Sequence, residues 1–168
     1  MRMLSPFIFC VLGLMACAAP SGLNQGVYED AQVRYRVVGP GAAWKPVRLQ
    51  NADLSWFQPT TGSTLLINSN CKGVKDVPLH SLTQHLLIGM TDKKIVAQDP
   101  IPFSNREALE TEAVTKIDGV PHQMKMLVLK KDGCVYDLVY AASPQFYEED
   151  MKAYVQTKGS FTGHARRR

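Results

Sequence analysis

The sequence predicts an α+β fold in which helices pack on a mainly antiparallel sheet. Two Asp-Gly pairs separate three β-rich runs in the second half of the chain, residues 108–117, 122–129 and 134–141. Asp-Gly between such runs favours tight hairpins, because its backbone accepts the positive φ that these turns require. Two other segments repeat apolar residues at helical spacing. Consecutive strands with helices set apart from them are typical of the α+β class.

Three strands are predicted in the first part of the chain. Residues 33–38 alternate apolar and polar side chains, which indicates a half-buried strand. The Gly- and Pro-rich segment 39–46 predicts a turn after it. Residues 52–57 and 63–69 are rich in apolar and β-forming residues and flank the turn sequence QPTTG, so they predict a second and a third strand.

An amphipathic helix is predicted next. Asp76 can cap its amino terminus, and Pro78 suits a first helical turn. Apolar residues then recur at i, i+3, i+7 and i+11, namely Leu79, Leu82, Leu86 and Met90. The following segment, residues 95–103, is extended but contains two prolines, which favours an edge position in the sheet.

The three β-rich runs predict an antiparallel meander, and a helix is predicted after it. Ser143-Pro144 suits a helix start, and an acidic cluster follows where the helix dipole favours negative charge. Four residues fall on one helical face: Tyr147, Met151, Tyr154 and Val155. Gly159 is placed to end this helix, and we expect Phe161 to fold back onto the apolar face.

The amino-terminal segment predicts export and lipidation. Residues 1–16 combine Arg2, an apolar stretch and small residues, which is the layout of a secretory signal peptide, and the apolar stretch is too short to span a bilayer. The tetrad Leu14-Met15-Ala16-Cys17 resembles the lipobox of bacterial prolipoproteins, in which diacylglycerol is attached to the cysteine. The residue directly after the cysteine is Ala18, and in this respect the chain resembles the prolipoproteins that are sorted to the outer membrane. The alternative is an ordinary signal peptide with Cys17 an incidental thiol.

The predicted organisation has one domain. Residues 17–32 are expected to form the lipidated amino terminus and a flexible spacer, residues 33–161 a single α+β domain, and residues 162–168 a basic tail. The net charge of +4 comes from Arg2 and the terminal run 166–168, without which 15 basic residues balance 15 acidic ones. A neutral body without a basic stripe argues against nucleic-acid binding.

Three segments resemble the PsbP-like family, the extrinsic subunits of photosystem II and their bacterial relatives. They are VRYRVVGPGAAWKPV, GCVYDLVYAASPQFYEED and FYEEDMKAYVQTKGSF. The resemblance spans most of the mature chain and is weakest over residues 71–103. It implies an α/β/α sandwich used as a binding or assembly module, and this family has no shared catalytic residues to transfer.

Two cysteines remain in the mature domain, Cys71 and Cys134, and an exported domain with one such pair favours a disulfide. The alternative is two buried thiols that lie far apart.

We expect no metal, cofactor or catalytic site. The histidines and cysteines form no zinc-binding spacing, and His80 and His85 would face different sides of a helix. No nucleophile elbow, Walker motif or dinucleotide-binding glycine pattern occurs.

Aromatic residues are the remaining candidates for a ligand or partner surface. The four singled out are Trp44, Trp56, Tyr136 and Tyr140. Core packing is the default interpretation of such residues. Trp44 is the best single candidate for exposure, because it lies in a Gly- and Pro-rich loop.

Three functions follow as hypotheses. The first is a non-catalytic, lipid-anchored envelope protein that docks onto or helps to assemble a membrane complex, and the predicted location is the periplasmic face of the outer membrane. The second is a carrier of an apolar or lipid ligand, and the third is an envelope hydrolase. A cavity would distinguish the second from the first, and a cleft with convergent ionisable groups would indicate the third.

Lipidation at Cys17 predicts a defined mass and location. Two or three acyl chains hold a protein stably at a bilayer, because each buried CH₂ contributes about 0.8 kcal/mol. Mass spectrometry of the mature protein should therefore find acyl mass on Cys17, and Cys17→Ala should abolish both this mass and membrane fractionation. Unchanged processing and fractionation in Cys17→Ala would contradict the prediction.

Overall fold

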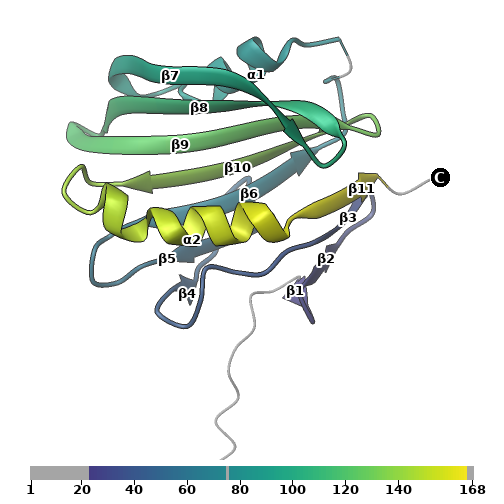
Figure 1. The fold of residues 1–168 in the computed structure, drawn as a ribbon, viewed down its shortest axis with the longest axis horizontal. Helices are drawn as coiled ribbons and strands as arrows, with labels where there is room; N and C mark the ends of the chain where they lie inside the picture. The colour runs from purple at the N-terminus through teal and green to yellow at the C-terminus, as the bar shows by residue number, and fades with distance from the viewer. Residues whose placement is uncertain (1–22, 75, 166–168) are drawn as a thin grey trace, which may run out of the picture.

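The computed structural model describes residues 23–74 and 76–165, and within them the main element is a seven-stranded antiparallel sheet (Figure 1). The strand order of this large sheet is β4-β5-β6-β10-β9-β8-β7. Its strands are β4 (Lys45–Pro46), β5 (Leu54–Phe57), β6 (Thr64–Asn70), β7 (Thr91–Phe103), β8 (Arg106–Ile117), β9 (Val120–Lys131) and β10 (Cys134–Ala142).

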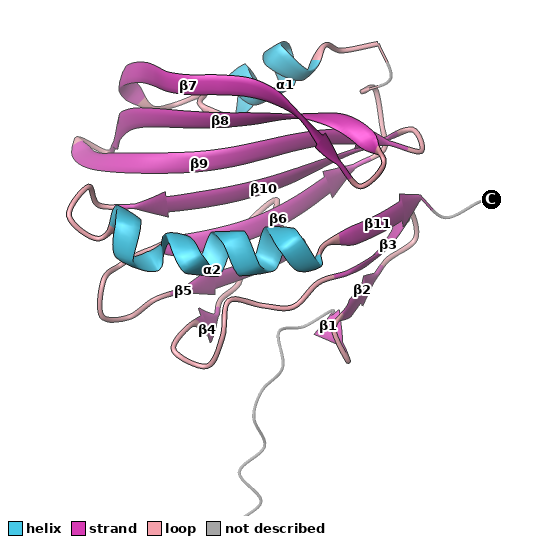
Figure 2. Cartoon of the chain, viewed as in Figure 1, coloured by secondary structure: helices cyan, strands magenta, loops and turns pink. Residues whose placement is uncertain are grey.

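A small sheet and two helices complete the described fold (Figure 2). The small sheet has the order β1-β2-β3-β11, and its strands are β1 (Leu23–Asn24), β2 (Val27–Glu29), β3 (Val33–Arg36) and β11 (Thr162–Ala165). The helices are α1 (Leu79–Leu86) and α2 (Tyr147–Ser160). The predicted α+β class with a mainly antiparallel sheet is therefore confirmed.

The alternation of side chains along β10 places the helices on opposite faces of the large sheet. Tyr136, Leu138 and Tyr140 belong to the main core, which also contains residues of α2 and of the small sheet. Val135 and Val139 point the other way, into two smaller clusters that contain residues of α1 and the segment after it. The large sheet is thus the middle layer, with α2 and the small sheet on one face and α1 on the other.

The predicted meander is confirmed, and local turn chemistry explains it. Asp118 and Gly119 have φ values of 49° and 81°, and Asp132 and Gly133 have values of 53° and 81°. Both residues of each pair thus have the positive φ that two-residue hairpins of type I′ require. Ser104 and Asn105, with φ values of 49° and 62°, make a third such hairpin between β7 and β8, which has no Asp-Gly pair to predict it.

The edge position expected for residues 95–103 is also correct. They form most of β7, which pairs only with β8 in the described sheet and begins earlier than expected, at Thr91. Pro100 and Pro102 have no backbone N–H to donate, so an edge strand accommodates them.

The ordered unit extends beyond the limits expected for it, residues 33–161. Part of the expected spacer, residues 17–32, forms β1 and β2, and part of the expected basic tail forms β11. β11 pairs with β3 from Thr162↔Arg36 to Ala165↔Val33. These strands are too short to show apolar alternation, and their pairing joins opposite ends of the chain, so the local sequence does not reveal them.

Neither helix has the ends that the sequence predicts. α1 begins after Pro78 without a side-chain cap, so Asp76 is not its N-cap, and it ends before Met90. α2 begins at Tyr147 rather than at Ser143, because the Phe146 N–H donates to the Ser143 carbonyl in a preceding turn. It continues to Ser160, so Gly159 lies inside the helix and does not end it as predicted. None of the described helices is both long and apolar enough to cross a membrane.

The main core is closed by aromatic packing and by one polar cluster. Phe161 is 3% exposed and its ring lies 5.3 Å from that of Tyr35 in the small sheet, so it is buried in the main core. Under α2, Glu110 of β8 accepts hydrogen bonds from the Tyr154 hydroxyl at 2.9 Å and the Lys158 ammonium at 2.7 Å. Burial opposes ionisation of Glu110, but these hydrogen bonds outweigh it and lower its pKa.

The disulfide predicted between Cys71 and Cys134 is present in the structure. It joins the residue after β6 to the first residue of β10, and these strands are neighbours, with Asn70 opposite Val135. Because the bond closes a loop with a sequence separation of 63 residues, chain entropy assigns it about 4 kcal/mol of stabilisation.

Candidate functional site

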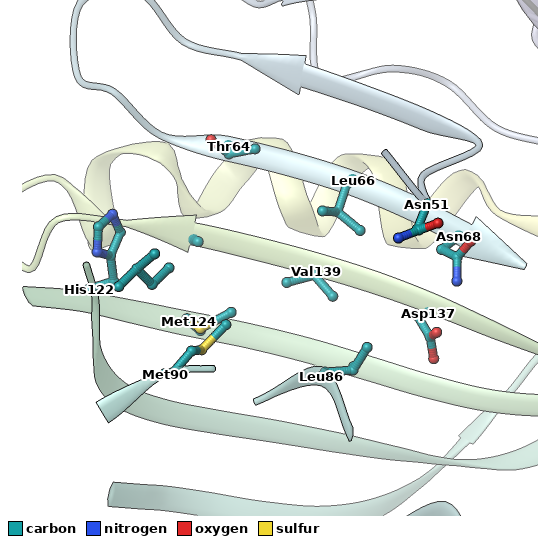
Figure 3. A pocket seen from close by; sticks show the side chains of 12 residues that line it. Asn51, Thr64, Leu66, Asn68, Leu86, Met90, His122, Met124, Asp137 and Val139 are labelled. Carbon is teal, nitrogen blue, oxygen red and sulfur yellow. The ribbon is translucent and has the colours of Figure 1, made fainter. Parts of the chain in front are cut away.

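A cavity of about 510 Å³ lies on the α1 face of the large sheet (Figure 3). Its volume is in the range of about 300–1,000 Å³ that is usual for small-molecule sites. Its walls come from β6, β8, β9 and β10, from α1, and from the segments next to them. The lining residues are Asn51, Thr64, Leu66, Asn68, Leu86, Met90, Ile117, His122, Met124, Asp137, Val139 and Ala141.

The cavity exists because α1 is too short to cover the sheet. With eight residues, α1 is about 12 Å long, whereas the 12 residues of β9 extend over about 40 Å. α1 packs on β8 and β9, where Leu82 and Leu86 meet the apolar side chains of the sheet. The adjoining surface of β6 and β10 therefore keeps apolar side chains that no helix covers.

The middle of the cavity is apolar. Leu66, Met124 and Val139 stand side by side on three neighbouring strands, and Leu86 and Met90 approach them from the α1 side (Figure 3). Two of these five residues are methionines, whose unbranched side chains adapt to differently shaped ligands. This lining favours an apolar ligand group over a sugar or a nucleotide.

One end of the cavity is polar. Asn51, Asn68 and Asp137 gather there, whereas His122 lies at the opposite end (Figure 3). Asp137 is only 7% exposed, and its Oδ1 atom has no hydrogen-bond partner among the described residues. Buried polar atoms nearly always have a partner, so this oxygen is available to accept a hydrogen bond from a group in the cavity.

Burial raises the pKa of Asp137 to about 7. A hydrogen bond from Asn68 acts in the opposite direction, and the nearby charge of Asp53 adds to the increase. Among the described residues, no basic side chain contributes to the shift in the pKa of Asp137. A carboxyl group that changes its charge near neutral pH inside an apolar cavity is a typical feature of functional sites.

The four aromatic candidates lie on the other side of the sheet, away from this cavity. Trp44, Trp56, Tyr136 and Tyr140 are between 0% and 7% exposed, and all belong to the main core. Tyr140, for example, donates a hydrogen bond of 2.8 Å to the Tyr147 carbonyl of α2. The suggestion that they form a ligand or partner surface is therefore wrong, including for Trp44, whose loop folds its indole inward.

The remaining candidates are placed as follows. Cys71 and Cys134 are bonded to each other, and within residues 23–74 and 76–165 no three histidine, cysteine or acidic side chains lie close enough together to hold a metal ion. Cys17 lies outside the described residues.

Sequence reasoning missed Asp137, although β10 contains a signal for it. Asp137 is the only charged residue in the strand CVYDLVYAA, in which eight of the nine residues are buried. A strand buried on both faces leaves an acidic side chain no route to solvent. The lone aspartate in this apolar run could therefore have identified the buried carboxyl, but not the cavity around it.

No protein-family model matches the chain, and no curated protein sequence matches it. Solved structures do resemble it. LpqN of Mycobacterium tuberculosis, described as involved in cell envelope biogenesis, has a TM-score of 0.59 and 12% sequence identity, covering 80% of this chain and 86% of LpqN. Cyanobacterial PsbP (CyanoP) of Synechocystis sp. PCC 6803 has a TM-score of 0.57 and 10% identity, covering 92% of this chain and 99% of CyanoP.

These likenesses establish the fold. The match to CyanoP confirms the PsbP-like architecture that the sequence segments suggested. At this level of identity, the similarity assigns neither ligand nor partner to the present chain.

The raised pKa of Asp137 predicts a pH-dependent stability. Between about pH 4 and pH 7 the folded protein keeps a proton that the unfolded chain releases, so Asp137 makes the free energy of unfolding fall as pH rises. The slope from one such group reaches about 1.4 kcal/mol per pH unit. Urea denaturation at several pH values should show that Asp137→Asn removes this decline and is more stable than the wild type above pH 7. Parallel pH profiles for the two proteins would contradict the prediction.

Proposed function

We propose that this protein is a non-catalytic envelope module that binds an apolar ligand in the α1-face cavity, and that a lipid on Cys17 holds it at the membrane. The observation that carries the proposal is the cavity itself, which combines an apolar body with a few polar groups at one end. That combination is typical of sites in which apolar surface provides affinity and a few polar groups fix the orientation of the ligand.

The cavity favours ligand carriage over the docking role that the sequence first suggested. A docking protein needs an exposed surface that complements its partner, and the aromatic residues considered for that surface are buried in the core. Ligand carriage requires a space between the sheet and its covering elements, and the α1 face has one of suitable volume.

The arrangement of ionisable groups supports a non-catalytic role. Asp137 and His122 are the ionisable side chains that line the cavity, and they lie at opposite ends of it (Figure 3). General acid–base catalysis requires such groups to lie within hydrogen-bond reach of the reacting atoms of one substrate. This separation argues against the envelope hydrolase hypothesis.

The proposed location rests on the amino-terminal sequence. The lipobox-like tetrad ending at Cys17 favours a lipid anchor, and Ala18 favours the outer membrane over retention in the inner membrane. The likeness of the fold to LpqN, a protein involved in cell envelope biogenesis, is compatible with this location. A carrier held close to a bilayer would exchange an apolar ligand with it over a short distance.

Filling the cavity should abolish ligand binding. Ala141 lines the cavity from β10 and is partly exposed, so Ala141→Trp places an indole in the space with little disturbance of the core. The affinity for N-phenyl-1-naphthylamine, a neutral apolar fluorescent probe, should fall by about tenfold or more, which corresponds to about 1.4 kcal/mol. Fluorescence titration measures this change.

Val155→Trp is the matched control, because it adds the same side chain at a residue of α2 that is 54% exposed. It should bind the probe as the wild type does. The proposal fails if the wild type does not bind the probe, or if Ala141→Trp binds it as tightly as Val155→Trp does.

A further inference from the structure

We infer that the ligand is an amphiphile with a protonated amine at one end, and that the Asp137 carboxylate binds this ammonium group while the apolar part occupies the rest of the cavity. The inference rests on the proposed function, because it names the chemical class of ligand for the same cavity. It starts from the one buried carboxylate oxygen in the cavity wall that lacks a partner among the described residues.

The position of Asp137 Oδ1 favours a ligand with a hydrogen-bond donor. Asp137 Oδ1 lies at the boundary of an apolar space and accepts no hydrogen bond from the described residues. An ionised carboxylate only accepts hydrogen bonds, so the ligand group that completes it must be a donor. The donor must also be carried by an apolar body, because Leu66, Met124 and Val139 form the adjoining walls.

The charges around the cavity select a cation among possible donors. Neither lysine nor arginine lines the cavity, and its other ionisable side chain, His122, lies at the far end. The charge found to act on Asp137 is that of Asp53, which is also acidic. An anionic head group would therefore meet repulsion at this end, whereas an ammonium group would neutralise a buried charge that the protein leaves uncompensated.

The two asparagines can accept the remaining hydrogen bonds of an ammonium group. A primary ammonium has three N–H donors. Asp137 Oδ1 can accept one, and the side-chain carbonyls of Asn51 and Asn68 can accept the other two, since all three residues meet at the same end of the cavity (Figure 3). Asn68 uses its amide N–H to hold the Asp137 carboxylate, which leaves its carbonyl oxygen to the ligand.

Three probes with the same chain and different head groups test the inference. Octylammonium, octanoate and 1-octanol are titrated by calorimetry into the full-length chain carrying Cys17→Ala and purified without detergent. The measurement is made at about pH 8, above the pKa of Asp137. Octylammonium should bind about tenfold more tightly than 1-octanol, because its cationic head group pairs with the Asp137 carboxylate whereas the hydroxyl is neutral. Octanoate should bind more weakly than both, because the carboxylate repels a second negative charge.

Asp137→Asn should remove the preference for octylammonium and leave the affinity for 1-octanol unchanged. Glu149→Gln makes the same change of acid to amide at an exposed residue of α2, on the opposite face of the large sheet, and should keep the preference. Equal affinities for the three probes in the wild type, or a preference that survives Asp137→Asn, overturn the inference but leave the proposed function standing. Failure of all three probes to bind the wild type overturns the proposed function as well.

A second readout needs no substitution at Asp137. Carbon NMR of the labelled carboxyl group reports its titration directly, and bound octylammonium should lower the pKa of Asp137 because a cation favours the ionised form. An unchanged pKa with octylammonium bound overturns the inference.

Discussion

Elements of very different size cover the two faces of the large sheet. One face is covered by α2 and the small sheet, which bury Tyr136, Tyr140 and the other main-core residues completely or nearly so. The other face receives an eight-residue helix that packs on β8 and β9. The difference in length between a short helix and long strands leaves apolar surface uncovered beside it. The cavity, its lining and the proposed function all follow from this mismatch.

The acidic residues differ in whether the fold supplies hydrogen-bond donors to their carboxylates. Glu110 receives hydrogen bonds from Tyr154 and Lys158, and Asp53 receives them from Tyr35 and Ser69. Asp137 is more deeply buried, yet one of its oxygens has no partner among the described residues. Stability alone would favour an apolar residue at such a position, because burying an incompletely paired carboxyl is costly. The ligand proposed above would supply the missing hydrogen-bond partner of this aspartate.

Features encoded in short segments could be predicted from the sequence, whereas features that depend on contacts between distant segments could not. Asp118-Gly119 and Asp132-Gly133 specify their hairpins locally, and the prolines of β7 specify an edge strand. β11 depends on pairing with β3 at the other end of the chain, and the inward position of Trp44 depends on the core that receives it. The cavity arises from the relative lengths of α1 and the strands, which no motif records. Asp137 was visible in the sequence, but its surroundings were not.

The central claim is that the uncovered part of the α1 face holds a small apolar molecule in the cell. Native mass spectrometry of protein isolated from its own membranes tests this claim most directly. The account predicts a wild-type species that carries one additional small molecule, bound without a covalent bond and lost when the protein is denatured. It also predicts that the same molecule is absent from Ala141→Trp prepared in parallel. Wild-type and Ala141→Trp proteins that both show only the mass of the chain would contradict it.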